Sequence, residues 1–237
     1  MKRLTMLLMV AAVLLGSCGA QGQGQGVGET RNESRSIQPE DARSVRAHLT
    51  IGAGEPKVGG AADALVEGPF SYNVADWKPQ VDYEVSGERG DLTEKQGSGD
   101  EGRLGGARNE WDLRFNDDVP TELVVEMGAG ESDLDLDSLT LTGLDLQMGA
   151  GETTVDLTGD YAQGFDASIE GGVGEATVLV PSEVGVRVRA EGGLGKVNAE
   201  GFRREGEAYV NDAYGDSDVS LNVDVRGGVG SINLEVV

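Results

Sequence analysis

The stretch LVVEMGAGESDLDL at residues 123–136 recurs as LDLQMGAGETTVDL at residues 144–157, and this repeat predicts the fold. In both copies apolar and polar residues alternate on either side of a Gly-Ala-Gly centre. Alternation with a period of two is typical of β-strands with one buried face. The sequence therefore predicts strands that turn a corner at glycines.

Three more Gly-x-Gly centres follow along the chain. The first glycines of the five centres are residues 128, 149, 172, 193 and 228, which are steps of 21, 23, 21 and 35. A unit of this size is too short to bury its own apolar face, so neighbouring units must stack. We therefore predict an all-β, stacked-strand β-solenoid, β-helix-like, with Gly-x-Gly corners. The longer last step predicts an insertion near residues 202–218, and Gly52-Ala53-Gly54-Glu55 is an outlying copy of the centre.

Glycine suits these corners because successive turns of a stack bring backbones close and need dihedral angles that other residues avoid. The residue between the two glycines is apolar in all five centres: Ala129, Ala150, Val173, Leu194 and Val229. From this we expect it to point into the core.

The N-terminus has the layout of an export signal. Lys2 and Arg3 precede an apolar run from Leu4 to Leu15, which is too short to span a bilayer. Leu15-Gly16-Ser17-Cys18 resembles a bacterial lipobox, although an ordinary signal containing a cysteine is the alternative. The lipobox implies removal of residues 1–17 and acylation of Cys18, the only cysteine in the chain, which anchors the protein to a membrane.

The remaining chain divides into three parts by composition. Residues 18–36 hold the lipidated cysteine and a Gly/Gln-rich segment with few apolar side chains, which predicts a flexible tether. Residues 37–108 predict an N-terminal β region, with strand, tight turn and strand over residues 45–60. Residues 109–237 form the repeat solenoid, which we expect to be continuous with the region before it.

The charge excludes one class of partner. The formal net charge is −23, with 42 acidic residues against 19 Lys and Arg, and a nucleic acid would be repelled by such a surface. Anionic lipid headgroups would be repelled as well, so membrane attachment must depend on the lipid of Cys18.

The glycine centres and the acidic inserted segment are the two candidate ligand sites. No phosphate-binding Gly-x-x-x-x-Gly-Lys-Ser/Thr occurs, and the glycine centres lack the aspartate of calcium-binding β-roll repeats, so we interpret them as corners without a cofactor. Asp212, Asp216 and Asp218 in the inserted segment are the best candidates for a metal site, although we favour a solvated acidic loop.

Catalysis finds little support. The only histidine, His48, has no identifiable partner, and neither a nucleophile elbow nor a zinc motif is present, so we assign no catalytic residues and expect a protein that is not an enzyme. The alternative is a polysaccharide-active enzyme with paired carboxylates. Chance pairs are inevitable among so many acids.

Four segments resemble the bacterial toast-rack domain proteins: the Met-Gly-Ala-Gly-Glu phrases, NEWDLR at 109–114, ADALVEGPF at 62–70 and YVND at 209–212. The domain is similar to the C-terminal β domain of LiaF-type cell-envelope stress regulators. The resemblance implies a β-strand stack, often exported or tethered, with no family active site. We expect an extracytoplasmic protein, lipid-anchored to a bacterial membrane, that acts as a scaffold, adhesion or envelope-stress sensing module. Its partner would be an envelope protein or a glycan.

Overall fold

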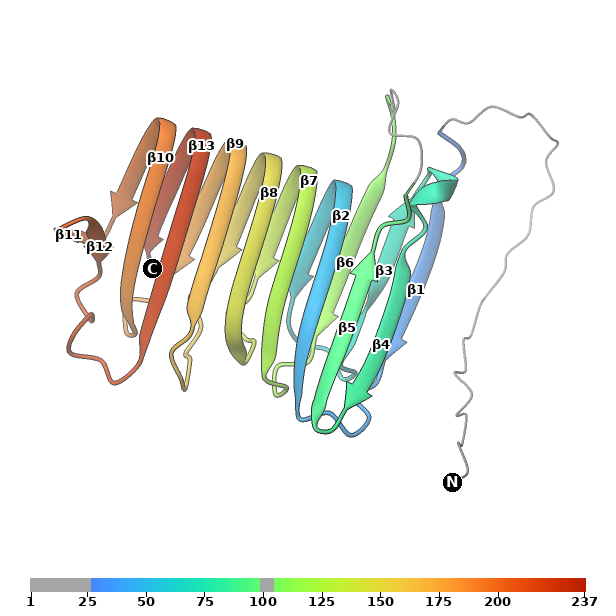
Figure 1. The fold of residues 1–237 in the computed structure, drawn as a ribbon, viewed down its shortest axis with the longest axis horizontal. Helices are drawn as coiled ribbons and strands as arrows, with labels where there is room; N and C mark the ends of the chain where they lie inside the picture. The colour runs from blue at the N-terminus through green and yellow to red at the C-terminus, as the bar shows by residue number, and fades with distance from the viewer. Residues whose placement is uncertain (1–26, 99–104) are drawn as a thin grey trace.

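The computed structural model describes residues 27–98 and 105–237, and these residues form thirteen strands in one sheet plus a short 3-10 helix, η1 (Ala75–Trp77) (Figure 1). The strands are β1 (Arg31–Ile37), β2 (Ser44–Gly59), β3 (Val66–Tyr72), β4 (Gln80–Ser86), β5 (Arg89–Lys95), β6 (Asn109–Phe115), β7 (Thr121–Asp135), β8 (Leu141–Asp156), β9 (Asp166–Val180), β10 (Gly185–Glu200), β11 (Arg203–Glu205), β12 (Ala208–Val210) and β13 (Ser220–Val236). The predicted all-β, stacked-strand solenoid is confirmed.

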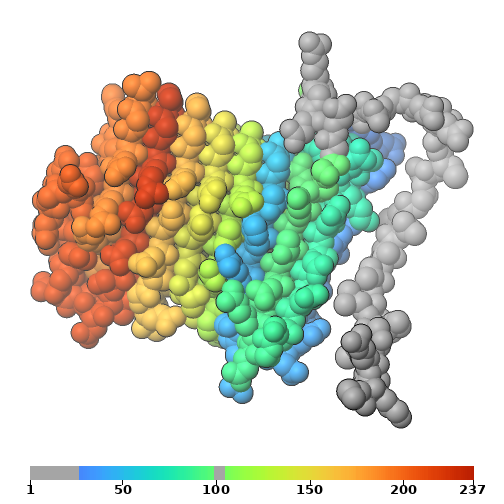
Figure 2. All heavy atoms as spheres, in the orientation of Figure 1, coloured from blue at the N-terminus to red at the C-terminus, as the bar shows by residue number. Residues whose placement is uncertain are grey.

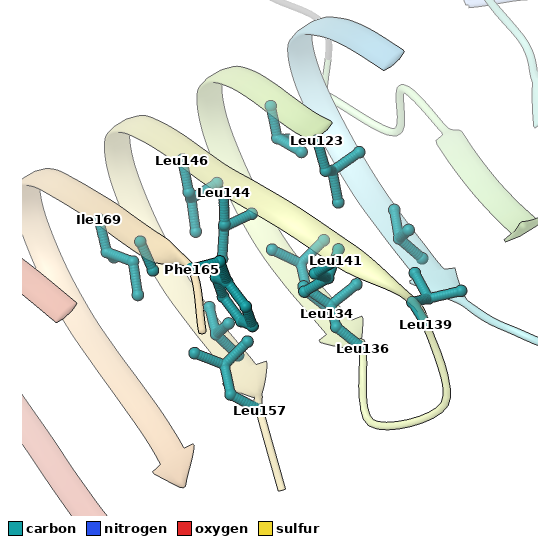
Figure 3. Packing of buried hydrophobic residues seen from close by; sticks show 14 of the residues in the cluster. Leu123, Leu134, Leu136, Leu139, Leu141, Leu144, Leu146, Leu157, Phe165 and Ile169 are labelled. Atoms are coloured by element: carbon teal, nitrogen blue, oxygen red, sulfur yellow. The ribbon is translucent and has the colours of Figure 1, made fainter. Parts of the chain in front are cut away.

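Six long strands form the stack. β2, β7, β8, β9, β13 and β10 run parallel, and each bends at its glycines so that its first and second halves enclose a common core (Figures 1 and 3). The ladder between β2 and β7 continues through the bend, with Ala53 opposite Ala129 and Val58 opposite Leu134. The predicted strand, turn and strand over residues 45–60 is therefore one bent strand, β2, and its glycines are the first corner of the solenoid.

The core consists of the inward side chains of both halves. In β7 these include Leu123 and Val125 before the bend and Leu134 after it, each without exposed surface. A fully buried leucine or valine contributes roughly 1.5–3 kcal/mol, so the repeated layers stabilise one another. Between β8 and β9, the rings of Tyr161 and Phe165 pack edge to face at 4.9 Å between their centroids and belong to the same core.

The order of the coils departs from the order of the chain. β13 pairs with β9 on one side and with β10 on the other, so the last strand lies between two earlier ones. The predicted insertion holds β11 and β12, and β12 pairs with the first half of β10 before the chain returns. β10 is consequently the end coil of the stack.

At the other end, side chains take the place of a preceding coil. Gln96 accepts hydrogen bonds from the backbone N–H groups of Gly52 and Ala53, at 2.8 and 3.2 Å. Asn109 donates to the carbonyl of Ala53 at 2.7 Å and accepts from Trp111 Nε1 at 2.9 Å. This buried network provides hydrogen-bond partners for the backbone groups of the first corner.

The N-terminal segment requires a correction. Residues 31–36, predicted as part of a flexible tether, belong to β1, which pairs with β3 from Arg31 to Ile37. Half-buried and exposed positions alternate along β1, so it forms a strand although it has no run of large apolar residues. The predicted signal and Cys18 lie outside the described residues. Within those residues, no helix has the length and apolar character needed to cross a membrane.

Candidate interaction surface at the glycine corners

An apolar ridge crosses the corners of the stack. It is made of the residue between the two glycines of each coil: Ala53, Ala129, Ala150, Val173, Val229 and Leu194. These residues pair in register from β2 to β10. We call this set the corner ridge. Figure 1 shows the bends aligned along one edge of the molecule, and Figure 2 shows them as a continuous row of atoms.

The corner ridge faces solvent, so the prediction that these residues point into the core is wrong. Val173, Val229 and Leu194 are 56%, 48% and 74% exposed, and Ala129 and Ala150 are exposed as well. At the apex of a bend the inward direction is already occupied by the two halves of the strand. The middle residue is therefore directed away from the core, and three large apolar side chains lie side by side in water.

Close packing of the glycines explains why the flanks of the corner ridge are bare backbone. A Cβ on Gly151 would lie 1.8 Å from the carbonyl oxygen of Gly130, and one on Gly174 would lie 1.7 Å from that of Gly151. Both glycines also have φ values, +136° and +141°, that other residues rarely adopt. Glycine is thus required on the C-terminal side of each apex residue.

A row of carboxylates runs beside the corner ridge. Glu131, Glu152 and Glu175 stand two residues after the apex in β7, β8 and β9, pair in register and are exposed. We call them the glutamate ladder. Within residues 27–98 and 105–237 none of them has an ion-pair partner, and only Glu175 accepts a side-chain hydrogen bond, from Asn233 Nδ2 at 3.0 Å.

Two acids on the other side of the corner ridge have neighbours that can offset their charge. Glu126 lies 3.4 Å from Nε2 of His48, and Glu170 forms an ion pair and a hydrogen bond with Arg226. The in-register row of acids without ion-pair partners therefore lies on the side of the second halves of the strands, from β7 to β9, and the same position of β10 is Lys196.

One open groove lined by acidic residues bears on the paired-carboxylate alternative. It has a volume of about 510 Å³ and is lined by Glu122, Asp166 and Asn222, among others. Glu122 lies 3.5 Å from Arg89, and Asp166 accepts a hydrogen bond from Asn222 at 3.1 Å. Its one aromatic residue, Phe165, is buried. The groove thus offers no exposed ring on which a sugar could stack.

One buried acid was missed by the sequence analysis. Glu94 in β5 is 1% exposed, and its Oε2 has no hydrogen-bond partner among residues 27–98 and 105–237. Burial raises the pKa of Glu94 to about 7, and the positive charge of Arg35 opposes this rise. The alternation of β5 could have indicated that Glu94 is buried, because Glu94 follows Leu92 by two residues and so shares its inward face.

Residues 26–179 match a described protein family, the N-terminal domain of toast_rack, DUF2154. That range covers more than half of the sequence and includes four of the six corners. The chain belongs to the toast-rack family. Its last two coils, β10 and β13, continue the same corner beyond the matched range.

A solved structure agrees with this assignment. A crystal structure of a candidate cell adhesion protein from Clostridium sporogenes is 37% identical to this toast-rack protein, with a TM-score of 0.86, over 88% of this chain and all of that one. A candidate adhesin from Bacteroides fragilis covers 88% of this chain and 97% of its own, but at 9% identity and a TM-score of 0.28 it carries no argument. Among curated proteins, none matches the chain at a significant level.

The predicted site residues of this toast-rack protein have different outcomes. Asp212, Asp216 and Asp218 are exposed in the loop between β12 and β13, and in the described part of the chain no group of three His, Cys, Asp or Glu residues could hold a metal ion. The neighbouring Asn211, not singled out from sequence, is fully buried and ties this loop to β10 through Val186. Cys18 stays a prediction.

Proposed function

We propose that this toast-rack protein is a lipid-anchored, non-catalytic adhesion protein of a bacterial cell envelope, and that the corner ridge is its adhesive surface. The observation that carries the proposal is the exposure of Val173, Val229 and Leu194 on three adjacent coils. Contiguous apolar side chains bordered by polar ones mark interaction sites on soluble proteins.

The placement of the predicted anchor supports this role. Cys18 precedes β1, which lies at one end of the strand order, while the most exposed ridge residue, Leu194, lies on β10 near the other end. Eight strand spacings of roughly 4.8 Å separate β1 from β10, about 38 Å in all. A lipid on Cys18 would thus hold the bulky end of the corner ridge away from the membrane.

The similar crystal structure supports the same function class. Its subject is a candidate cell adhesion protein, and 37% identity over its full length makes a related role the simplest inference. A stack of bent strands is also rigid, which suits a surface that must stay presented to a partner.

Cells that carry the native protein, or variants of it, provide the test, with aggregation and retention on protein-coated glass as readouts. The ridge variant, Val173→Ser with Val229→Ser and Leu194→Ser, should lose adhesion while its surface level and melting temperature stay unchanged, because exposed substitutions alter stability by less than about 0.5 kcal/mol. Cys18→Ala should also lose adhesion, because the protein is released from the cell.

A matched control uses two large apolar residues that are exposed away from the corner ridge, Val27 and Val237, which are 41% and 65% exposed. Val27→Ser with Val237→Ser should adhere like the native protein. Native adhesion by the ridge variant would overturn the proposal.

A further inference from the structure

We infer that the corner ridge and the glutamate ladder together form a docking surface for a basic, amphipathic α-helix of a partner protein. The inference rests on the proposed adhesive role and deepens it by naming the chemistry of the partner. Two features carry it: the exposed apolar row from β7 to β10, and a row of carboxylates without ion-pair partners, two residues further along β7, β8 and β9. On β13 and β10 the same register position is Ser231 and Lys196, so the carboxylate row ends at β9.

The glutamate ladder favours a cationic partner. Its carboxylates belong to adjacent strands about 4.8 Å apart, a spacing at which like charges in register repel one another. On the opposite flank, Glu170 already has a cationic neighbour in Arg226. Lys or Arg side chains of a partner would relieve the repulsion that this chain leaves uncompensated.

The same charge argues against other occupants. A second copy docked face to face would bring two glutamate ladders together, and a polyanion would be repelled by them. A purely apolar partner would cover the corner ridge but would leave Glu131, Glu152 and Glu175 without compensation. A partner segment with an apolar stripe beside a basic stripe would cover the corner ridge and pair with the glutamate ladder.

The spacing of the rows favours a helix over an extended strand. Same-face side chains of an extended segment repeat about every 6.8 Å, whereas the turns of an α-helix repeat every 5.4 Å. The coils repeat about every 4.8 Å, so a helix laid along the corner ridge stays close to register over three coils while a strand does not. From β7 to β10 the surface is four spacings long, about 19 Å, which corresponds to roughly 13 helical residues.

The probe is a fluorescent peptide of about 18 Leu and Lys residues, written so that Leu forms one helical stripe. Two control peptides are used: one scrambles the same composition so that no stripe forms, and the other replaces Lys by Glu. The protein is the chain from residue 18 onward with Cys18→Ala, and fluorescence anisotropy measures the dissociation constant at several salt concentrations.

Three protein variants separate local binding from general charge attraction. The ladder variant, Glu131→Gln with Glu152→Gln and Glu175→Gln, should bind the striped peptide about tenfold more weakly and with a smaller salt dependence. The ridge variant should also bind about tenfold more weakly. The charge-matched control changes exposed acids elsewhere, Asp82→Asn with Glu84→Gln and Glu183→Gln, and should stay within about twofold of the parent protein.

Each result decides the inference. It is supported if the ladder and ridge variants lose binding and the control does not. Equal loss in the ladder variant and the charge-matched control, or equally tight binding of the scrambled peptide, would overturn it. So would dimerisation of the protein, or sedimentation with zwitterionic vesicles, that depended on Leu194. Ridge-dependent cell adhesion without peptide binding would reject the helix but keep the proposed function, and peptide binding without such adhesion would reject the proposed function.

Discussion

Replacing Glu94 by Gln should remove a pH dependence of stability that the fold imposes on this chain. Glu94 is buried, no described residue forms a hydrogen bond with its Oε2, and burial raises its pKa from 4.5 to about 7. Below pH 4.5 the carboxyl is protonated in both the folded and unfolded states. As the pH rises from 4.5 to 7 the unfolded state loses this proton first, so stability falls. The difference of 2.5 pKa units corresponds to about 3 kcal/mol.

Urea unfolding between pH 4.5 and 8, on the native chain and on Glu94→Gln, measures this effect. At pH 4.5 the two proteins should have similar free energies of unfolding, and at pH 8 the variant should be more stable by about 3 kcal/mol. Other acids contribute equally to both proteins and cancel in the difference. Glu84→Gln, at an exposed position of the neighbouring β4, should leave the pH dependence unchanged. A difference between native and Glu94→Gln proteins that stays constant with pH would refute the reasoning.

Two further substitutions test the corner and the inserted loop. Gly174→Ala places a Cβ against the carbonyl of Gly151 and should destabilise the protein by at least about 3 kcal/mol in thermal melts. At Gly171 an added Cβ would lie 3.9 Å from its nearest neighbour, the carbonyl oxygen of Arg226, so Gly171→Ala should range from neutral to about 1 kcal/mol stabilising. Equal melting temperatures for these two variants would contradict the close-packed corner. Asn211→Ala removes the acceptor for Val186 N–H and a donor to two carbonyls, so urea unfolding should show a loss of roughly 4 kcal/mol; a loss below 1 kcal/mol would mean that water replaces the side chain.

The sequence predicts the architecture of the stack well because two local rules act together. Alternation identifies the buried face of each strand, and the Gly-x-Gly centres identify the corners, down to the outlying copy at residues 52–55. Both rules hold because every coil must satisfy the same packing with its neighbours. The family resemblance inferred from short phrases is confirmed by the family match.

The orientation of the corner residue was predictable in principle but was predicted wrongly. In β7 the inward residues are odd-numbered before the corner, as in Val125 and Met127, and even-numbered after it, as in Ser132 and Leu134. The alternation therefore slips by one residue across each corner. A side chain at the point of the slip belongs to neither inward series, and this is why Ala129 and its equivalents face solvent.

Other features depend on contacts that local patterns do not contain. The insertion of β13 between β9 and β10 cannot be inferred from spacing, because every coil presents the same corner and accepts any other coil beside it. β1 has few large apolar residues and owes its place to the edge of β3. The glutamate ladder also emerges only when strands 21 and 23 residues apart are set in register.

If the corner ridge is the surface buried during adhesion, photochemical footprinting should show that it becomes protected. Adherent and suspended cells carrying the native protein would be labelled with a diazirine reagent, which marks exposed C–H groups, and the labelled peptides quantified by mass spectrometry. We expect Val173, Val229 and Leu194 to lose label on adhesion while Val237, which is 65% exposed, keeps it. Unchanged labelling of the corner ridge, with protection of another surface, would contradict the account.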